Sequence, residues 1–176
     1  MNNTLKEILA VALIVAMCFA FAACGSKDEG GPVDNGGDTF SFATEDFEGN
    51  AFTSNDVKDA KLVMINLWEP WCGPCVGEMP DLERIYEENK DKGFVILGVF
   101  SETSQDEEAA QILADSGITY PILRYSNEFD GFQTGYVPTT VFLTGEGKLL
   151  SEEPLIGSRS YEDWTTIVQG LLEDLE

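Results

Sequence analysis

The chain has 176 residues, with 32 acidic and 10 basic side chains and no histidine, which gives a formal net charge of −22 at pH 7. This charge repels the phosphates of nucleic acids and the headgroups of anionic lipids, so both classes of ligand are excluded. A solvated acidic surface is the simplest interpretation of the charge, and a surface that meets a basic partner is the alternative.

An apolar run over residues 8–23 follows Lys6 and is too short to span a bilayer comfortably, which is typical of a signal peptide. The small residues on both sides of Cys24 resemble the bacterial lipobox, in which lipid is attached to the cysteine and the leader is removed. We therefore expect a lipoprotein signal peptide over residues 1–23 and a lipidated Cys24. This places the protein on the extracytoplasmic face of the bacterial cell membrane. An uncleaved anchor and ordinary signal cleavage are the alternatives.

A segment without apolar periodicity follows, with five glycines and four acidic residues between residues 25 and 39. Together with the lipidated cysteine, residues 24–39 are interpreted as a flexible tether. The remaining residues, 40–176, are numerous enough to bury one hydrophobic core, so we expect a single domain there.

The first elements of this domain are short. Phenylalanines around a Glu-Gly-Asn turn predict an N-terminal β-hairpin between residues 40 and 52, and Ser54 is expected to cap a short helical turn. The run Lys61–Leu67 is almost continuously apolar, which predicts a strand covered on both faces.

Cys72 and Cys75 come directly after this strand, where the spacing of Met79, Leu82 and Tyr86 predicts an amphipathic helix. Unpaired N–H groups at the helix start stabilise a thiolate on Cys72, and a thiolate is the nucleophile in thiol–disulfide exchange.

A zinc site is one alternative for the cysteine pair, but zinc needs four ligands and the chain has no histidine. A structural disulfide is another, but a loop of two intervening residues restrains the unfolded chain very little. We therefore expect a redox-active disulfide and no metal site. Cys72, at the exposed helix start, is expected to attack, and Cys75 to resolve the mixed disulfide.

Further strands and helices follow along the chain. Phe94–Phe100 reads as a second buried strand, residues 104–107 as the capping box of a helix that ends at Gly117, residues 118–123 as a strand and residues 127–134 as a short helix. A final helix is predicted from apolar residues spaced four, three and four apart, namely Trp164, Val168, Leu171 and Leu175.

Two stretches, residues 66–80 and 136–148, resemble the TlpA/ResA-like extracytoplasmic thiol–disulfide oxidoreductases of the thioredoxin-like superfamily. The first contains two tryptophans before the first cysteine and a Glu and a Pro after the second. The second is similar to the cis-proline loop, strand and hairpin turn of that family. Over residues 40–176 the resemblance implies an α/β, thioredoxin-like fold. Its central mixed β-sheet is flanked by helices, with an N-terminal β-hairpin and a helix-strand insert in the middle of the domain.

The resemblance also implies a substrate-binding site. The Val137–Pro138 bond is expected to be cis, with the Val137 backbone pairing with an extended substrate segment. Gly73 and Pro74, between the cysteines, are expected to contact the substrate as well. Trp71 is expected to contact substrate or, equally, to fill the core.

Asn66 stands where thioredoxins place a buried aspartate that moves protons, and an amide cannot do so. We expect Glu78 to replace it, because Glu78 lies one turn beyond Cys75 and helical side chains lean toward the N-terminus. The alternative is an exposed helix acid without a role.

The most favoured function is a membrane-tethered disulfide reductase without cofactors, because the Gly-Pro dipeptide between the cysteines is that of thioredoxin. A membrane thiol-electron transporter would supply its electrons. Its substrates would be exported proteins with disulfides, such as apocytochrome c or methionine sulfoxide reductase, and we expect a monomer. A disulfide oxidase or isomerase and a non-catalytic binding lipoprotein are the alternatives.

Overall fold

The structure, a computed structural model, describes residues 39–176. The expected signal peptide, the lipidated Cys24 and the tether up to residue 38 lie outside the described residues.

A five-stranded mixed sheet forms the centre of the domain. Its strands are β3 Leu62–Leu67, β4 Phe94–Phe100, β5 Ile122–Arg124, β6 Thr139–Leu143 and β7 Leu155–Ile156, in the order β5-β4-β3-β6-β7. Strands β4 and β5 run parallel to β3, whereas β6 is antiparallel to β3 and β7 is antiparallel to β6. The carboxyl ends of β3, β4 and β5 therefore meet the start of β6 at one end of the sheet.

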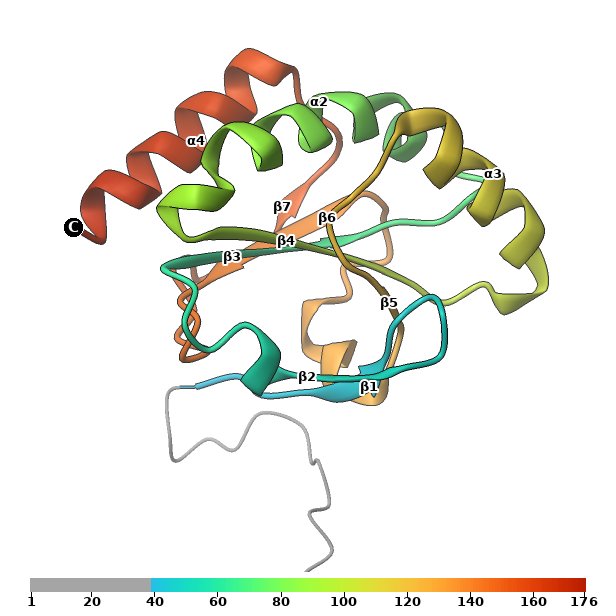
Figure 1. Ribbon diagram of the computed structural model, residues 1–176, viewed down its shortest axis with the longest axis horizontal. Coiled ribbons are helices and arrows are strands. Elements are labelled where there is room, and N and C mark those ends of the chain that lie inside the picture. The colour runs from blue at the N-terminus through green and yellow to red at the C-terminus, as the bar shows by residue number, and fades with distance from the viewer. Residues whose placement is uncertain (1–38) are drawn as a thin grey trace, which may run out of the picture.

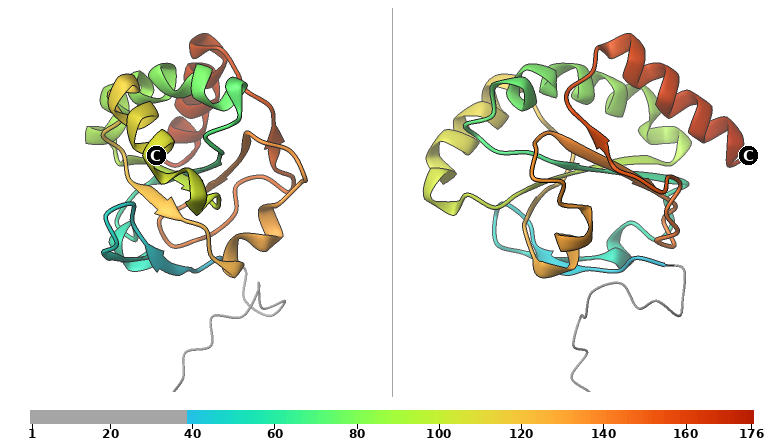
Figure 2. Two further views of the ribbon diagram at one scale, coloured as in Figure 1. Left: turned by 90° about the vertical axis from the view of Figure 1, so that its right-hand side faces the viewer. Right: turned by 180° about the vertical axis from the view of Figure 1, so that it is seen from behind.

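Helices cover one face of this sheet, and the N-terminal hairpin lies on the other (Figure 1; Figure 2). The helices are α2 Gly73–Asn89, α3 Asp106–Ser116 and α4 Tyr161–Asp174. The opposite face carries the antiparallel strands β1 Ala43–Glu45 and β2 Ala51–Thr53 and the 3-10 helix η4 Asn127–Phe132. Three short 3-10 helices complete the domain: η1 Ser54–Asp56, η2 Lys90–Lys92 and η3 Thr103–Gln105.

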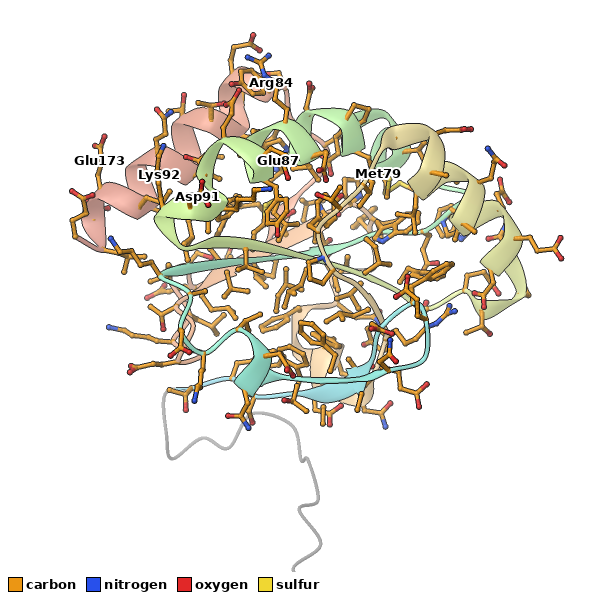
Figure 3. All side chains as sticks on the ribbon, in the orientation of Figure 1. Met79, Arg84, Glu87, Asp91, Lys92 and Glu173 are labelled. Atoms are coloured by element: carbon orange, nitrogen blue, oxygen red, sulfur yellow. A yellow bond between two sulfur atoms is a disulfide. The ribbon has the colours of Figure 1, made fainter. Side chains whose placement is uncertain are left out.

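The two faces of the sheet have separate hydrophobic cores, as expected for strands that are apolar on both sides. The core under the helices contains Trp68 and Trp164, and the core under the hairpin contains Phe40 and Phe129. Figure 3 shows Met79 under α2, toward the sheet, while charged side chains stand on the outer surface of that helix. The thioredoxin-like fold, the N-terminal hairpin and the helix-strand insert, which is α3 and β5, are confirmed.

Three local predictions are wrong. Ser104 does not cap α3: it lies in η3, its hydroxyl donates to the Glu102 carboxylate at 2.6 Å, and Gln105 at the N-cap makes no side-chain cap. The strand predicted from residue 118 begins only at Ile122. Thr119, in the first part of the predicted strand, is held by α2 instead, because Glu83 accepts hydrogen bonds from its amide and its hydroxyl.

Ser54 also differs from its predicted role, since Thr53 is the N-cap of η1. The Ser54 hydroxyl accepts a hydrogen bond from the Phe42 amide at 2.7 Å and so joins the helical turn to the N-terminal segment.

Candidate active site

Cys72 and Cys75 form a disulfide at the carboxyl end of β3, with an S–S distance of 2.02 Å. Cys72 is the N-cap of α2, and the backbone N–H of Cys75 donates a hydrogen bond to Cys72 Sγ at 3.2 Å. The same donor would stabilise a thiolate on Cys72 once the disulfide is reduced.

Exposure does not separate the two cysteines as the sequence led us to expect. Cys72 is 4% exposed and Cys75 is 1% exposed, although Gly73 and Pro74 at the helix start are exposed as expected. The two sulfurs differ instead in their electrostatic surroundings, because Cys72 Sγ accepts the helix N–H. An attacking role for Cys72 therefore rests on its position at the helix start.

The loop before β6 lies against the disulfide. The Val137–Pro138 peptide bond is cis, as predicted, and the carbonyl oxygen of Val137 lies 3.6 Å from Cys72 Sγ. The loop is held by Thr139, whose hydroxyl donates to the Tyr136 carbonyl at 2.6 Å and lies 2.9 Å from the Thr134 hydroxyl. These two threonines were missed in the sequence, where nothing distinguishes them from ordinary strand and loop residues.

Glu78 is 3% exposed, which excludes the alternative of an exposed helix acid. Three donors reach its carboxylate: Asn66 Nδ2 donates to Oε1 at 3.2 Å, while Trp164 Nε1 and the Arg159 amide donate to Oε2 at 3.0 and 3.1 Å. Burial raises the pKa of Glu78 above its ordinary value, and the three hydrogen bonds counteract this only in part. None of these hydrogen bonds goes to a cysteine.

The two tryptophans before Cys72 have different environments. Trp68 is 1% exposed and packs on Phe100, whereas Trp71 is 63% exposed, so Trp71 does not fill the core. Gly73 and Pro74 are exposed beside it at the first turn of α2. Trp71 and these two residues thus form an accessible rim around the disulfide.

Glu69, three residues before Cys72, is a third residue that the sequence did not single out. Its carboxylate accepts hydrogen bonds from the Ser101 amide and hydroxyl at 3.1 and 2.6 Å and from the Glu102 amide at 3.2 Å. Its carbonyl oxygen accepts the Cys72 amide at 3.0 Å. Glu69 therefore ties the loop that carries Trp71 and Cys72 to the loop after β4.

Within residues 39–176, no three side chains of Cys, Asp or Glu are arranged to hold a metal ion. In the same range, no helix is both long enough and apolar enough to cross a membrane.

Comparison with known proteins gives concordant results. Residues 36–149 match the AhpC/TSA family. The thiol-disulfide oxidoreductase ResA of Halalkalibacterium halodurans is 30% identical over 112 residues, which are 62% of this chain and 62% of that relative. The thioredoxin-like protein YneN of Bacillus subtilis is 31% identical over 149 residues, 84% of this chain and 86% of that protein.

Solved structures share the fold. The crystal structure of a thiol:disulfide interchange protein of the thioredoxin family from Chlorobium tepidum TLS superposes with a TM-score of 0.67 at 25% identity. The match covers 80% of this chain and 99% of that one.

Proposed function

Because the chain belongs to the AhpC/TSA family and is related to thiol–disulfide oxidoreductases, we propose that it catalyses thiol–disulfide exchange through Cys72 and Cys75. The observation that carries this proposal is the hydrogen bond from the Cys75 amide to Cys72 Sγ at the start of α2, beside the carbonyl of Val137. A dithiol at this position has a stabilised nucleophile and a neighbouring backbone segment that can hold a substrate chain.

The reaction proceeds in two displacements. The Cys72 thiolate attacks one sulfur of the substrate disulfide, forms a mixed disulfide and expels the other substrate sulfur as a thiolate. The Cys75 thiolate then attacks Cys72 Sγ, which releases the second substrate thiol and forms the Cys72–Cys75 disulfide. The second displacement requires Cys75 to lose a proton. Glu78, buried one turn further along α2 and with a raised pKa, is proposed to accept it.

The substrate chain is proposed to lie along the exposed rim formed by Trp71, Gly73 and Pro74 and to pair with the backbone of Val137 next to Pro138. Such pairing positions a cysteine of an extended segment over Cys72 without fixing its neighbours. This accommodates several different substrate proteins.

The proposed direction is reduction. The Gly-Pro dipeptide between the cysteines is that of thioredoxin, whose reduction potential is about −270 mV, whereas that of the oxidant DsbA is about −120 mV. Electrons would come from a membrane thiol transporter, because no nicotinamide pool exists outside the cell. Disulfide-containing exported proteins would be the substrates, and the enzyme is proposed to act as a monomer.

Two measurements test the activity and its direction. The protein should accelerate the reduction of insulin by dithiothreitol, and Cys72→Ser should remove the acceleration. Equilibration with glutathione or dithiothreitol should give a potential closer to that of thioredoxin than to that of DsbA. Absence of acceleration would favour the non-catalytic binding lipoprotein, and a potential near that of DsbA would favour the oxidase or isomerase.

Tethering is proposed from the sequence of residues 1–39, with a leader over residues 1–23, lipid on Cys24 and residues 24–39 as the tether of the domain at 40–176. Cys24→Ala should release the protein from membranes or leave it unprocessed, and Cys18→Ala, a control inside the leader, should do neither. Labelling with a fatty-acid analogue should mark the wild type. A wild type without label would refute lipidation.

A further inference from the structure

A pocket of about 410 Å³ opens beside the disulfide, at the carboxyl ends of β3 and β4. We call it the Glu69 pocket; its walls include Glu69, Trp71, Ser101, Tyr125, Tyr136 and Val137. Trp71 precedes Cys72, and the carbonyl of Val137 touches Cys72 Sγ, so the pocket is continuous with the proposed catalytic site. A substrate chain paired with Val137 would direct a side chain next to its cysteine into this pocket.

Glu69 is the one charged residue in the walls of the Glu69 pocket, which contain no lysine or arginine. Glu69 lies in the pocket wall, and its carboxylate accepts hydrogen bonds from the amide and hydroxyl of Ser101 and from the amide of Glu102. Asp130, outside the lining, accepts the hydroxyl hydrogen of Tyr125, which is a residue of the pocket wall. Burial and this hydrogen bond raise the pKa of Tyr125 to about 12, so the tyrosine remains neutral and the negative charge of Asp130 remains next to it.

Most cations of the described domain lie away from the pocket. Five lysines lie at the opposite end of the sheet, around the amino ends of β3 and β4 and the turn after β6: Lys58, Lys61, Lys90, Lys92 and Lys148. Figure 3 labels Lys92 at that end. Arg124 lies over the ring of Phe100 in the pocket wall and is paired with Asp106. Arg84 lies over Tyr161, and Arg159 lies over Trp164. Five of the eight cations of the described domain therefore lie away from the disulfide, and Arg124, at the same end as the disulfide, is paired with an acid.

Aromatic side chains complete the pocket. Tyr136 is 69% exposed and, with Trp71, flanks the opening, while the ring of Tyr125 lies in the wall. Exposed aromatics that gather around one groove mark a binding site, and their faces attract cations. A long side chain with an apolar stem and a positive head fits both the rings and the carboxylates.

We propose that the Glu69 pocket binds an arginine or lysine side chain that flanks the cysteine of the substrate. The proposal rests on the thiol–disulfide exchange proposed above and adds a substrate class to it, namely cysteines in a basic sequence context. The net charge of −22 then contributes to recognition, because it draws basic segments toward the domain while the pocket selects the side chain next to the cysteine.

Short peptides with a single cysteine, blocked as a mixed disulfide with thionitrobenzoate, provide the test. The pre-reduced enzyme attacks this disulfide with Cys72, and release of the coloured thiolate gives a second-order rate constant. The residue on either side of the cysteine is varied among arginine, lysine, citrulline, leucine and glutamate. Citrulline has the shape of arginine without its charge, so the arginine-to-citrulline ratio isolates the charge.

We expect arginine to react about fivefold faster than citrulline at low salt, with the ratio falling as salt is added. Glu69→Gln should reduce the ratio to about twofold or less, whereas the same charge change at Glu128, outside the pocket, should leave it unchanged. Tyr136→Leu changes a side chain that is 69% exposed, so it provides a second test, and it should also lower the ratio.

Three results would overturn the inference: equal rates for arginine and citrulline, the highest rate for leucine, or a ratio that Glu69→Gln and Tyr136→Leu both leave intact. In each of these three cases the wild type still reduces the peptides, so the proposed thiol–disulfide exchange is retained. If no peptide reacts faster with the wild type than with Cys72→Ser, the proposed thiol–disulfide exchange itself has failed.

Discussion

The Glu78→Gln variant should fold, and its stability should depend less on pH than that of the wild type. The glutamine oxygen can keep the hydrogen bonds from Trp164 Nε1 and the Arg159 amide. Its Nε2 would then face Asn66, whose amide can rotate, because its other partner is the Thr140 hydroxyl, which can donate as well as accept. Every hydrogen bond of the carboxylate thus has a neutral replacement.

Two opposing effects determine how much Glu78→Gln changes the free energy of unfolding at neutral pH. Hydrogen bonds to a charged group are worth about 1.5–3 kcal/mol and those between neutral groups about 0.5–1.5 kcal/mol, so the two retained bonds lose about 1 kcal/mol each. Glutamine does not carry the desolvation cost of a buried carboxylate, which is the cause of the raised pKa of Glu78. We therefore expect a net change in the free energy of unfolding of about 1 kcal/mol or less.

The pH dependence has a definite sign. Because the pKa of Glu78 is higher in the folded protein than the ordinary value of 4.5, the native state retains its proton after the unfolded chain has lost it. The contribution of Glu78 to stability is therefore complete below pH 4.5 and is lost as the pH rises through the folded pKa. The free energy of unfolding falls over this interval by about 1.4 kcal/mol for each pKa unit between the two states.

Urea unfolding of the oxidised proteins between pH 4 and pH 8 measures this difference, because the disulfide keeps the cysteines from titrating. The free energy of unfolding of the wild type, minus that of Glu78→Gln, should fall as the pH rises. Glu173→Gln, a control at an acid outside the site, should behave like the wild type (Figure 3). A difference that stays constant or grows with pH would refute a raised pKa. If reduced Glu78→Gln exchanges disulfides at the rate of the wild type from pH 5 to pH 9, proton transfer through Glu78 is refuted.

Three further predictions concern the thiols and the packing. Cys72→Ser should abolish reduction, while Cys75→Ser should accumulate mixed disulfides with substrates in cells; trapping through Cys75 alone would reverse the two roles. Gly145→Ala should destabilise the protein by about 3 kcal/mol in urea unfolding, because a Cβ there would lie 2.4 Å from a backbone carbonyl oxygen. Gly77→Ala should instead stabilise it by about 0.5–1 kcal/mol, because a Cβ at this position of α2 would lie in open space. Trp164→Phe should cost about 1.5–3 kcal/mol near neutral pH through loss of its donor to the buried carboxylate, and a cost independent of pH would contradict this assignment.

The elements nearest the disulfide were predictable from local sequence. Strands β3 and β4 are covered on both faces, so their apolar runs are continuous, and α2 has the periodicity of a helix with one buried face. The prediction from residue 118 failed because Glu83, from another element, holds Thr119 away from the strand. An interaction of this kind leaves no local pattern in either segment.

The same limit applies to the site. The cysteine pair and the cis bond before Pro138 were predicted, and so was the position of Glu78 on α2. The partners of the Glu78 carboxylate were not, because Arg159 and Trp164 lie 81 and 86 positions further along the chain. The hydrogen bonds between Glu69 and the loop after β4 were not predicted for the same reason, since the partners of Glu69 follow 32 and 33 positions later.

Both outer strands of the central sheet are short, with three residues in β5 and two in β7. Backbone acceptors on the outer side of β5 are also occupied: the Ile122 carbonyl accepts the Phe47 amide at 2.8 Å, and the Arg124 carbonyl accepts the Thr44 hydroxyl at 2.7 Å. A sheet edge of this kind offers little template for strand addition by a second molecule. Resistance to aggregation is thus built into the backbone as well as the charge, and we expect the folded domain to stay dispersed even in salt concentrations that screen its acidic surface.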